Sequence, residues 1–219
     1  MGLLVDPQRQ YQRSGDPEGE GGPPEGDLEP AAGRVVAVMP AYNEDPDVLR
    51  ACLDALLAGS CVPDVIHVVD DGSDAPLERY DHERVIWHRH FMNQGKRWAQ
   101  VTALRDETTA DFIVTLDSDS VPQEHALREC LRALADPGVQ AATAVVGVRN
   151  RRRNLLTRLL DLELVHGCLV QRAARSSLGA VAPTSGAFAV YRAAVIRDNF
   201  VDYLQIDAPI NRGNSGGPT

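Results

Sequence analysis

The chain has 219 residues, enough for one domain with a sizeable core but short for two. Hydrophobic residues make up 43% of it and charged residues 24%, proportions that exclude a collagen-like or wholly disordered chain. The formal net charge of −9 argues against a nucleic-acid binder with a basic surface, so local groups or a metal ion would have to hold any anionic ligand.

The first segment in chain order is a predicted disordered tail over residues 1–33. Its centre, residues 12–30, is rich in glycine, proline and acidic residues and nearly free of apolar ones. Such a segment cannot bury enough apolar surface to offset the entropy lost on ordering. Because this tail carries many of the acidic residues, we expect the folded part to be less acidic than the whole chain.

Strands and helices are predicted to alternate from Arg34 onward. β-Branched and apolar runs predict strands, and apolar residues at helical spacing predict helices. In chain order we expect a strand at 34–39, a helix at 47–57, strands at 65–69 and 84–87, a helix at 94–106, a strand at 112–116, a helix at 124–135, a strand at 139–148, a longer amphipathic helix at 154–175 and a strand at 187–191. This alternation predicts an α/β domain over 34–203, with a mainly parallel sheet and helices on both faces. An irregular tail, 204–219, is expected to follow it.

Acidic residues follow several of these predicted strands. They occur in the sequences PAYNE (40–44), DDGS (70–73) and DSDS (117–120), with NQGKR (93–97) between the last two. Each sequence alone is also typical of a turn or helix cap. Ligands of an open parallel sheet, however, bind beyond the carboxyl ends of its strands. Carboxylates gathered there repel one another unless a cation joins them, and their oxygens suit Mg²⁺ or Mn²⁺.

These motifs, together with SGAFAVYR (185–192), resemble those of the family 2 glycosyltransferases in order and approximate spacing. The resemblance covers residues 35–203 and is greatest for the branch of hyaluronan synthases and chitin-oligosaccharide synthases. It implies a nucleotide-sugar-binding GT-A fold, with Mg²⁺ or Mn²⁺ as cofactor. It also implies inverting transfer of a sugar from a UDP-sugar to a glycan acceptor in polysaccharide synthesis. The alternative is a UDP-sugar-binding fragment without transfer activity.

The resemblance also implies roles for individual residues. Ala41, Tyr42 and Glu44 would border the uridine pocket, and Asp70 or Asp71 would accept a hydrogen bond from the uracil imide. Lys96, the only lysine of the sequence, would approach the diphosphate or the base. Asp117 and Asp119 would form the acidic pair, with Asp119 the preferred metal ligand. The metal would neutralise the diphosphate as the sugar C1–O bond breaks. Ser185 and Gly186 would lie near the acceptor, where a small residue lets a sugar approach the backbone.

The last residues differ from the family pattern. After Tyr203 the family continues with an acidic motif that carries the general base, a QxxRW-like motif and membrane helices, and none of these occurs in the sequence. The expectation is therefore a C-terminally incomplete transferase. The end, QIDAPINRGNSGGP (205–218), resembles the nucleophile segment of Deg-type serine proteases, with Ser215 at the nucleophile position. A serine nucleophile needs a histidine base, an orienting aspartate and a double β-barrel to hold them, whereas the preceding chain is predicted to be α/β. We therefore interpret this end as a junction, such as that of a chimeric or frame-shifted gene product, or as a glycine-rich tail similar by convergence. A serine protease fragment is a remote alternative.

The sequence also supports expectations about location, one basic segment, the cysteines and two histidines. No apolar run approaches about 18 residues and no signal peptide is evident, so a cytoplasmic location is expected. The segment 149–175 is basic and rich in leucine. One interpretation is that its arginines are solvated and its leucines are part of the core; the alternative is peripheral contact with an anionic membrane, at the inner face of the plasma membrane. The four cysteines lack zinc or disulfide spacing and are expected to be reduced. His88 and His90 are interpreted as a solvated strand end rather than a metal site.

Overall fold

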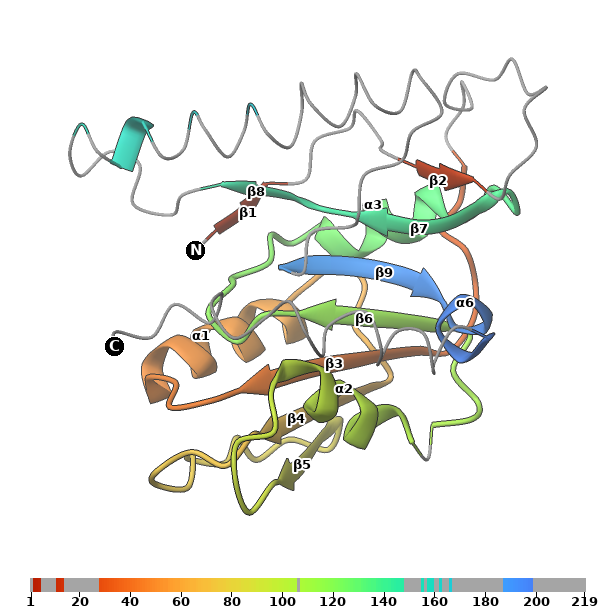
Figure 1. Cartoon of the computed structure of the whole chain (residues 1–219). Coiled ribbons are helices and arrows are strands. Elements are labelled where there is room, and N and C mark those ends of the chain that lie inside the picture. Colours follow the sequence, from red (N-terminus) through yellow and green to blue (C-terminus); the bar gives the residue numbers. More distant parts are fainter. Residues whose placement is uncertain are drawn as a thin grey trace.

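The computed structural model describes residues 28–105, 107–147 and 187–198, together with Gly2–Leu4, Tyr11–Arg13 and a few positions between 155 and 166. A seven-stranded sheet lies at the centre of these residues, in the order β2–β7–β9–β6–β3–β4–β5 (Figure 1). Its strands are β2 (Tyr11–Arg13), β3 (Val35–Ala41), β4 (Val65–Asp70), β5 (Val85–Arg89), β6 (Phe112–Leu116), β7 (Val139–Thr143) and β9 (Phe188–Arg192). A separate pair joins β1 (Gly2–Leu4) to β8 (Val145–Gly147).

Most strands of the sheet run in one direction. β6, β3, β4 and β5 pair in parallel. β9 lies antiparallel to both β6 and β7, so β7 runs in the same direction as the parallel set. β2 is antiparallel to β7. The prediction of a mainly parallel sheet is therefore confirmed, and the carboxyl ends of β3, β4, β5 and β6 lie at one edge.

Helices cover both faces of the sheet, as predicted. They are α1 (Pro46–Leu57), α2 (Lys96–Leu104), α3 (Ala126–Ala133) and α6 (Ala193–Asp198). Alternate residues of β3 face opposite sides: Met39 packs in the cluster with α1 and α3, whereas Val38 packs against α2. Val36 packs against α6 on the same side as Val38. Figure 1 shows α2 on one side of the sheet and α1 and α3 on the other.

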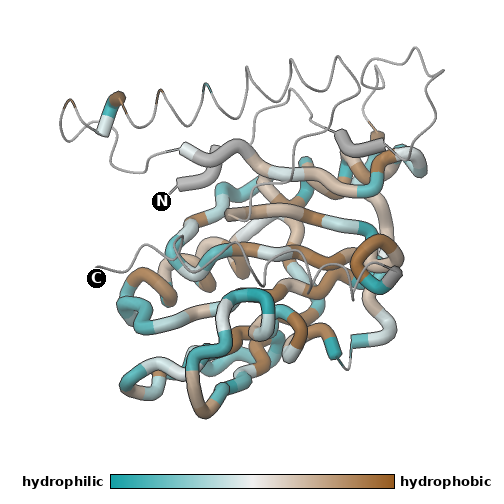
Figure 2. Tube along the Cα trace, viewed as in Figure 1, coloured by the Kyte–Doolittle hydropathy of each residue, from teal (hydrophilic) through white to brown (hydrophobic). Residues whose placement is uncertain are grey.

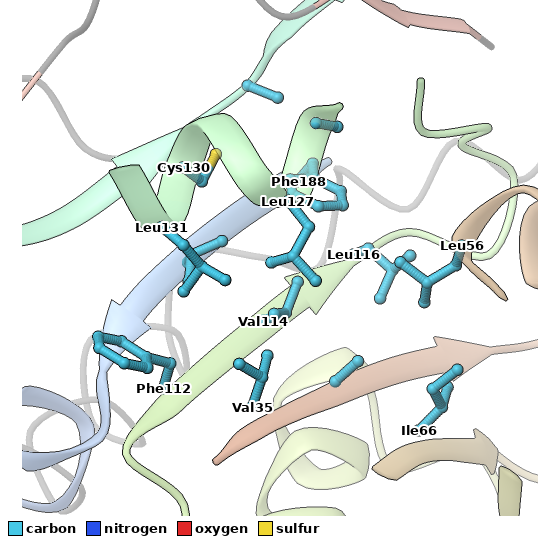
Figure 3. Packing of buried hydrophobic residues seen from close by; sticks show 14 of the residues in the cluster. Val35, Leu56, Ile66, Phe112, Val114, Leu116, Leu127, Cys130, Leu131 and Phe188 are labelled. Atoms are coloured by element: carbon cyan, nitrogen blue, oxygen red, sulfur yellow. The ribbon is translucent and has the colours of Figure 1, made fainter. Parts of the chain in front are cut away.

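The larger core lies between the sheet and the helices α1 and α3. Leu127 and Leu131 of α3 lie over β6 and β9, close to Val114 and Phe188 (Figure 3). Each such side chain, once fully buried, contributes about 2 kcal/mol of transfer free energy. Hydrophobic residues occupy the central strands, and hydrophilic residues are frequent in the loops at the strand ends (Figure 2). The packed hydrophobic core therefore holds the strands in place, and the polar side chains that could bind a ligand lie in the loops at the strand ends.

Local signals fix where the helices near these loops begin. α1 follows β3 after a short loop, with Pro46 in its first turn and the Asp45 carboxylate accepting a hydrogen bond of 2.9 Å from the Asp47 backbone N–H. α2 begins differently, because its N-cap is Gly95, at φ 94°, and no side chain caps it. The start of α2 therefore depends on contacts from outside the helix.

The structure differs from the sequence prediction in a few elements. The strand expected at 139–148 is divided at Ala144, whose N–H donates to the Phe188 carbonyl, and α6 was not predicted because six residues give too little helical periodicity. β1 and β2 lie within the predicted disordered tail. They pair with β8 and β7 and supply hydrogen-bond partners for the backbone groups at the edges of those strands. The helix expected at 154–175 lies mostly outside the described residues. Cys52, Cys61 and Cys130 are free thiols, and no helix among the described residues has the length and apolarity needed to cross a membrane.

Candidate functional site

Four loops meet at the carboxyl edge of the parallel strands. We call them the β3 loop (42–45), the β4 loop (71–77), the β5 loop (90–95) and the β6 loop (117–120). Each leaves the end of a neighbouring parallel strand, so the sheet alone brings them together. Side chains then connect each loop to the next.

Asn43 connects the β3 and β4 loops. Its backbone N–H donates to Ser73 Oγ at 2.9 Å, and its amide Nδ2 donates to Asp74 Oδ2 at 3.1 Å. The Asp74 backbone N–H donates in return to Asn43 Oδ1 at 2.9 Å. Asn43 has φ 50°, a left-handed conformation that asparagine tolerates better than most residues. The reciprocal contacts hold this turn in place.

Asp71 connects the β4 and β5 loops. Its Oδ1 lies 2.7 Å from His90 Nδ1 and accepts the Gln94 N–H at 3.0 Å, while its Oδ2 accepts the Gly95 N–H at 2.7 Å. The loops are also in close contact at Gly72, where a Cβ would lie 2.3 Å from the Met92 carbonyl carbon. Only glycine fits there, because a Cβ would overlap this backbone and φ is 74°.

Asp70, at the end of β4, organises the β4 loop itself. Its Oδ1 accepts the Ser73 N–H at 2.9 Å, and its Oδ2 lies 3.0 Å from Arg89 Nη1. Burial raises the pKa of this carboxyl, but hydrogen bonds from Ser73 and Leu77 and the charge of Arg89 together lower the pKa below its usual value. Asp70 is therefore held as a buried carboxylate.

Two further contacts close the sequence of loops into a ring. Lys96, the first residue of α2, forms an ion pair with Asp117 of the β6 loop. Ser118 Oγ donates to Glu44 Oε2 at 2.7 Å, and this bond joins the β6 loop to the β3 loop. We refer to the four loops and these contacts as the loop ring.

The described carboxylates at the loop ring create a negative local field. Cys52 of α1 lies beneath them, with Sγ 3.7 Å from the Asp117 carbonyl oxygen. Burial raises the pKa of this thiol strongly, and the charges of Asp119, Asp117 and Glu44 raise it further. The field therefore reaches this buried thiol and favours a cationic group at the ring.

The carboxylates suit a divalent cation that a ligand helps to bind. Among the described residues, no group of three or more Asp, Glu, His or Cys side chains could hold a metal ion by itself. Asp117 and Asp119 nevertheless supply two carboxylates two residues apart, with Asp119 exposed. Mg²⁺ is commonly held by one or two carboxylates together with phosphate oxygens. The residues present therefore fit a cation that is held jointly by these carboxylates and by phosphate oxygens of a ligand. They fit less well a cation held by protein side chains alone.

The residues singled out in the sequence lie at this edge wherever the structure describes them. Ala41 is buried at the end of β3, and Tyr42 beside it is 47% exposed. Glu44, Asp70, Asp71, Lys96, Asp117 and Asp119 all belong to the loop ring or to the strands and helix that bear it. Ser185, Gly186 and Ser215 lie outside the described residues.

Sequence reasoning missed several contacts at the site. His90 was interpreted as part of a solvated strand end, but it is buried and bonded to Asp71, so that interpretation is wrong. Asn43 and Ser118 were not assigned a role, although each joins two loops. Their positions inside the PAYNE and DSDS motifs were the available signal.

Comparisons with known proteins agree with the motifs. The sequence model of the family described as "Glycosyl transferase family 2" matches residues 36–200. The hyaluronan synthase of Streptococcus pyogenes is 39% identical over 181 residues, covering 78% of this chain and 43% of that protein. An N-acetylglucosaminyltransferase of Rhizobium sp. (strain N33) is 35% identical over 166 residues, covering 72% of this chain and 37% of that protein. The chain thus spans less than half the length of these curated relatives.

A solved structure is similar in fold. The mannosyltransferase PcManGT from Pyrobaculum calidifontis, in complex with GDP-Man and Mn²⁺, gives a TM-score of 0.54 at 23% sequence identity. The match covers 78% of this chain and 49% of that chain.

Proposed function

Because this chain belongs to glycosyltransferase family 2 and has a GT-A fold, we propose that its loop ring binds the nucleotide diphosphate of a UDP-sugar. The observation that carries the proposal is the ring itself. Contacts through Asn43, Asp71, Lys96 and Ser118 join four successive strand-end loops around one acidic edge. Ligands of open parallel sheets bind at such an edge.

The cation and the diphosphate would share the same residues. Asp119, with Asp117, would hold Mg²⁺ or Mn²⁺, and the mannosyltransferase of similar fold supports this because its structure contains Mn²⁺ with a nucleotide sugar. When bound, the cation supplies positive charge that stabilises the departing diphosphate. Lys96 would contribute its ammonium to the same phosphate oxygens after separating from Asp117.

The uridine would lie against the β3 and β4 loops. Tyr42 offers a partly exposed aromatic ring, and Ala41 is too small to block the base. Of the two candidate acceptors for the uracil imide, Asp71 accepts fewer hydrogen bonds. It accepts three, from His90, Gln94 and Gly95. Asp70 accepts from the backbone and the side chain of Ser73 and also from Leu77 and Arg89. We therefore favour Asp71 for that contact.

For the whole protein we propose transfer of the sugar to a glycan acceptor with inversion at the anomeric carbon, in polysaccharide synthesis. Similarity to a hyaluronan synthase and to N-acetylglucosaminyltransferases supports this class of substrates. Ser185 and Gly186 would adjoin the acceptor. A second candidate function is binding of a UDP-sugar without sugar transfer, because the described site residues are all proposed to contact the donor. An assay of UDP release separates the two functions, since only the transferase releases UDP.

We also propose peripheral contact of segment 149–175 with an anionic membrane, at the cytoplasmic face. Leu155, Leu159 and Leu162 recur at helical spacing and are 72%, 54% and 65% exposed, and arginines precede them. Apolar residues beside basic ones favour the surface of an anionic bilayer.

Calorimetric titration with a nucleotide panel tests the donor proposal. In the presence of Mn²⁺ we expect UDP to bind about tenfold or more tightly than GDP, ADP or CMP, because the imide contact and the diphosphate contact are both required. Asp71→Asn should reduce the preference for UDP. Equal affinity for UDP and GDP, or no binding of UDP, would contradict the proposal.

A further inference from the structure

We propose that His90 is a positioning residue that fixes the β5 loop and thereby places Lys96 for the diphosphate. The inference rests on the proposed function of the loop ring. His90 reaches the donor only through Asp71, which holds the Gln94 and Gly95 backbone before Lys96 and is also the favoured acceptor of the uracil imide.

The imidazole of His90 connects three elements. It follows β5 directly, and its backbone N–H donates to the Asp70 carbonyl at 2.8 Å. Nδ1 lies 2.7 Å from Asp71 Oδ1, and Nε2 lies 2.7 Å from the Thr102 hydroxyl in α2. The residue is only 9% exposed. Both ring nitrogens are therefore used, and the ring bridges the β4 loop and α2.

The chemistry of the partners defines the direction of these bonds. An ionised carboxylate only accepts, so His90 Nδ1 donates to Asp71. The Thr102 hydroxyl can donate or accept, so it satisfies Nε2 in either protonation state of the ring. Asp71 thus receives donors from His90 and from the Gln94 and Gly95 backbone together. The imidazole fixes the carboxylate on which the β5 loop is held.

Apart from the close contact of its Met92–Asn93 backbone with Gly72, polar contacts are the main restraint on this loop, because its side chains are little packed. Phe91 is 97% exposed and Met92 is 60% exposed. A Cβ placed on Gly95 would meet nothing within 4 Å, and no side chain caps the start of α2. Without the bonds to Asp71, apolar burial would do little to hold the backbone that precedes Lys96.

Lys96 follows Gly95 at once and forms its ion pair across the ring with Asp117. A shift of the Gly95 backbone therefore moves the ammonium relative to the acidic pair. Loss of a hydrogen bond to a charged group corresponds to about a tenfold change in an equilibrium constant. We expect UDP affinity to fall by about that factor when His90 is removed.

The test compares His90→Ala and His90→Asn in the full chain. Asparagine keeps a donor near the position of Nδ1, so it should retain the bond to Asp71 and most of the UDP affinity. Alanine should lose about tenfold in UDP affinity with Mn²⁺ present and should accelerate amide hydrogen exchange at Gln94 and Gly95. His125→Ala is the matched control, because His125 is an exposed histidine whose Nδ1 contacts Ser60 Oγ at 2.9 Å.

A double-mutant cycle separates positioning from general stability. Inorganic pyrophosphate, which has no uracil for Asp71 to bind, is the ligand of this cycle. In a Lys96→Met background, His90→Ala should change pyrophosphate affinity with Mn²⁺ by less than about twofold, since the ammonium that it places is absent. A full additional tenfold loss there would assign His90 a merely structural role and overturn the proposal.

Hydrogen exchange decides the question independently of UDP. Unchanged exchange at Gln94 and Gly95 in His90→Ala would overturn the proposal, even if UDP affinity fell. If the wild type failed to bind UDP, the proposed function would fail, while the exchange rates would still show whether His90 fixes the loop. If His90→Ala failed to fold, retention of UDP affinity by His90→Asn would support the proposal and a tenfold loss in it would contradict it.

Discussion

Replacing Lys96 with methionine should change the affinities for metal and nucleotide in opposite directions. In the structure Lys96 is paired with Asp117, one of the two carboxylates proposed to hold the cation. Lys96→Met removes the positive charge while keeping a side chain of similar length. Mn²⁺ should then bind more tightly to the nucleotide-free protein, because Asp117 is no longer neutralised. UDP should bind more weakly, because the diphosphate loses an ammonium partner.

The magnitude follows from the exposure of the pair. Two unit charges about 4 Å apart attract by about 4 kcal/mol at an effective dielectric constant of ~20. The Lys96 and Asp117 side chains are 43% and 35% exposed, so solvent screening reduces the contribution to about 1 kcal/mol. This corresponds to about a fivefold gain in Mn²⁺ affinity. The loss of a charge-assisted bond to phosphate should weaken UDP by about tenfold or more.

The assay measures free Mn²⁺ by electron paramagnetic resonance during titration without nucleotide, and UDP by calorimetry at saturating Mn²⁺. Lys96→Arg is the control, because it keeps the charge and should leave Mn²⁺ affinity nearly unchanged. The gain in Lys96→Met should shrink at high ionic strength. Unchanged or weaker Mn²⁺ binding by Lys96→Met would refute the idea that Lys96 neutralises the metal-binding carboxylate.

Two further predictions concern stability and the C-terminal segment. Burial and then the neighbouring His88 lower the pKa of His67, while Glu107 opposes them, so the folded state binds fewer protons than the unfolded state. The free energy of unfolding should therefore fall as pH drops below about 6.5, and it should fall less steeply in His67→Gln. Denaturant titrations at several pH values measure this dependence. An identical dependence of the unfolding free energy on pH in both proteins would contradict the assignment to His67. Ser215→Ala should leave UDP affinity and thermal stability unchanged, and labelling of wild type by a fluorophosphonate probe that the substitution abolishes would instead support the protease alternative.

The fold could be predicted from the sequence because its strands and helices differ clearly in pattern. β6 is buried along its whole length, and α1 carries a regular apolar stripe with a proline and an aspartate at its start. Short elements lacked such signals. The six residues of α6 and the three-residue strands β1 and β2 owe their structure to partners distant in sequence.

The place of the candidate site was predictable, but its connections were not. Parallel strands bring their ends to one edge, so the acidic motifs were expected together. Sequence alone does not say which backbone groups a carboxylate will accept from. For Asp71 these are the N–H groups of Gln94 and Gly95, more than twenty residues away. His90 was misjudged because β5 ends at Arg89, so the next residue leaves the strand and turns its ring toward α2.

The Mn²⁺ dependence of UDP binding, measured in the wild type and in Asp119→Asn, tests most directly whether the loop ring binds a diphosphate. The loop ring is proposed to bind the diphosphate together with a cation, so Mn²⁺ should tighten UDP binding by about tenfold or more in the wild type. Asp119→Asn should remove most of that gain, whereas Glu124→Gln, at an exposed acidic residue before α3, should keep it. UDP binding of equal strength with and without Mn²⁺ in both proteins would contradict a cation shared between Asp119 and the diphosphate.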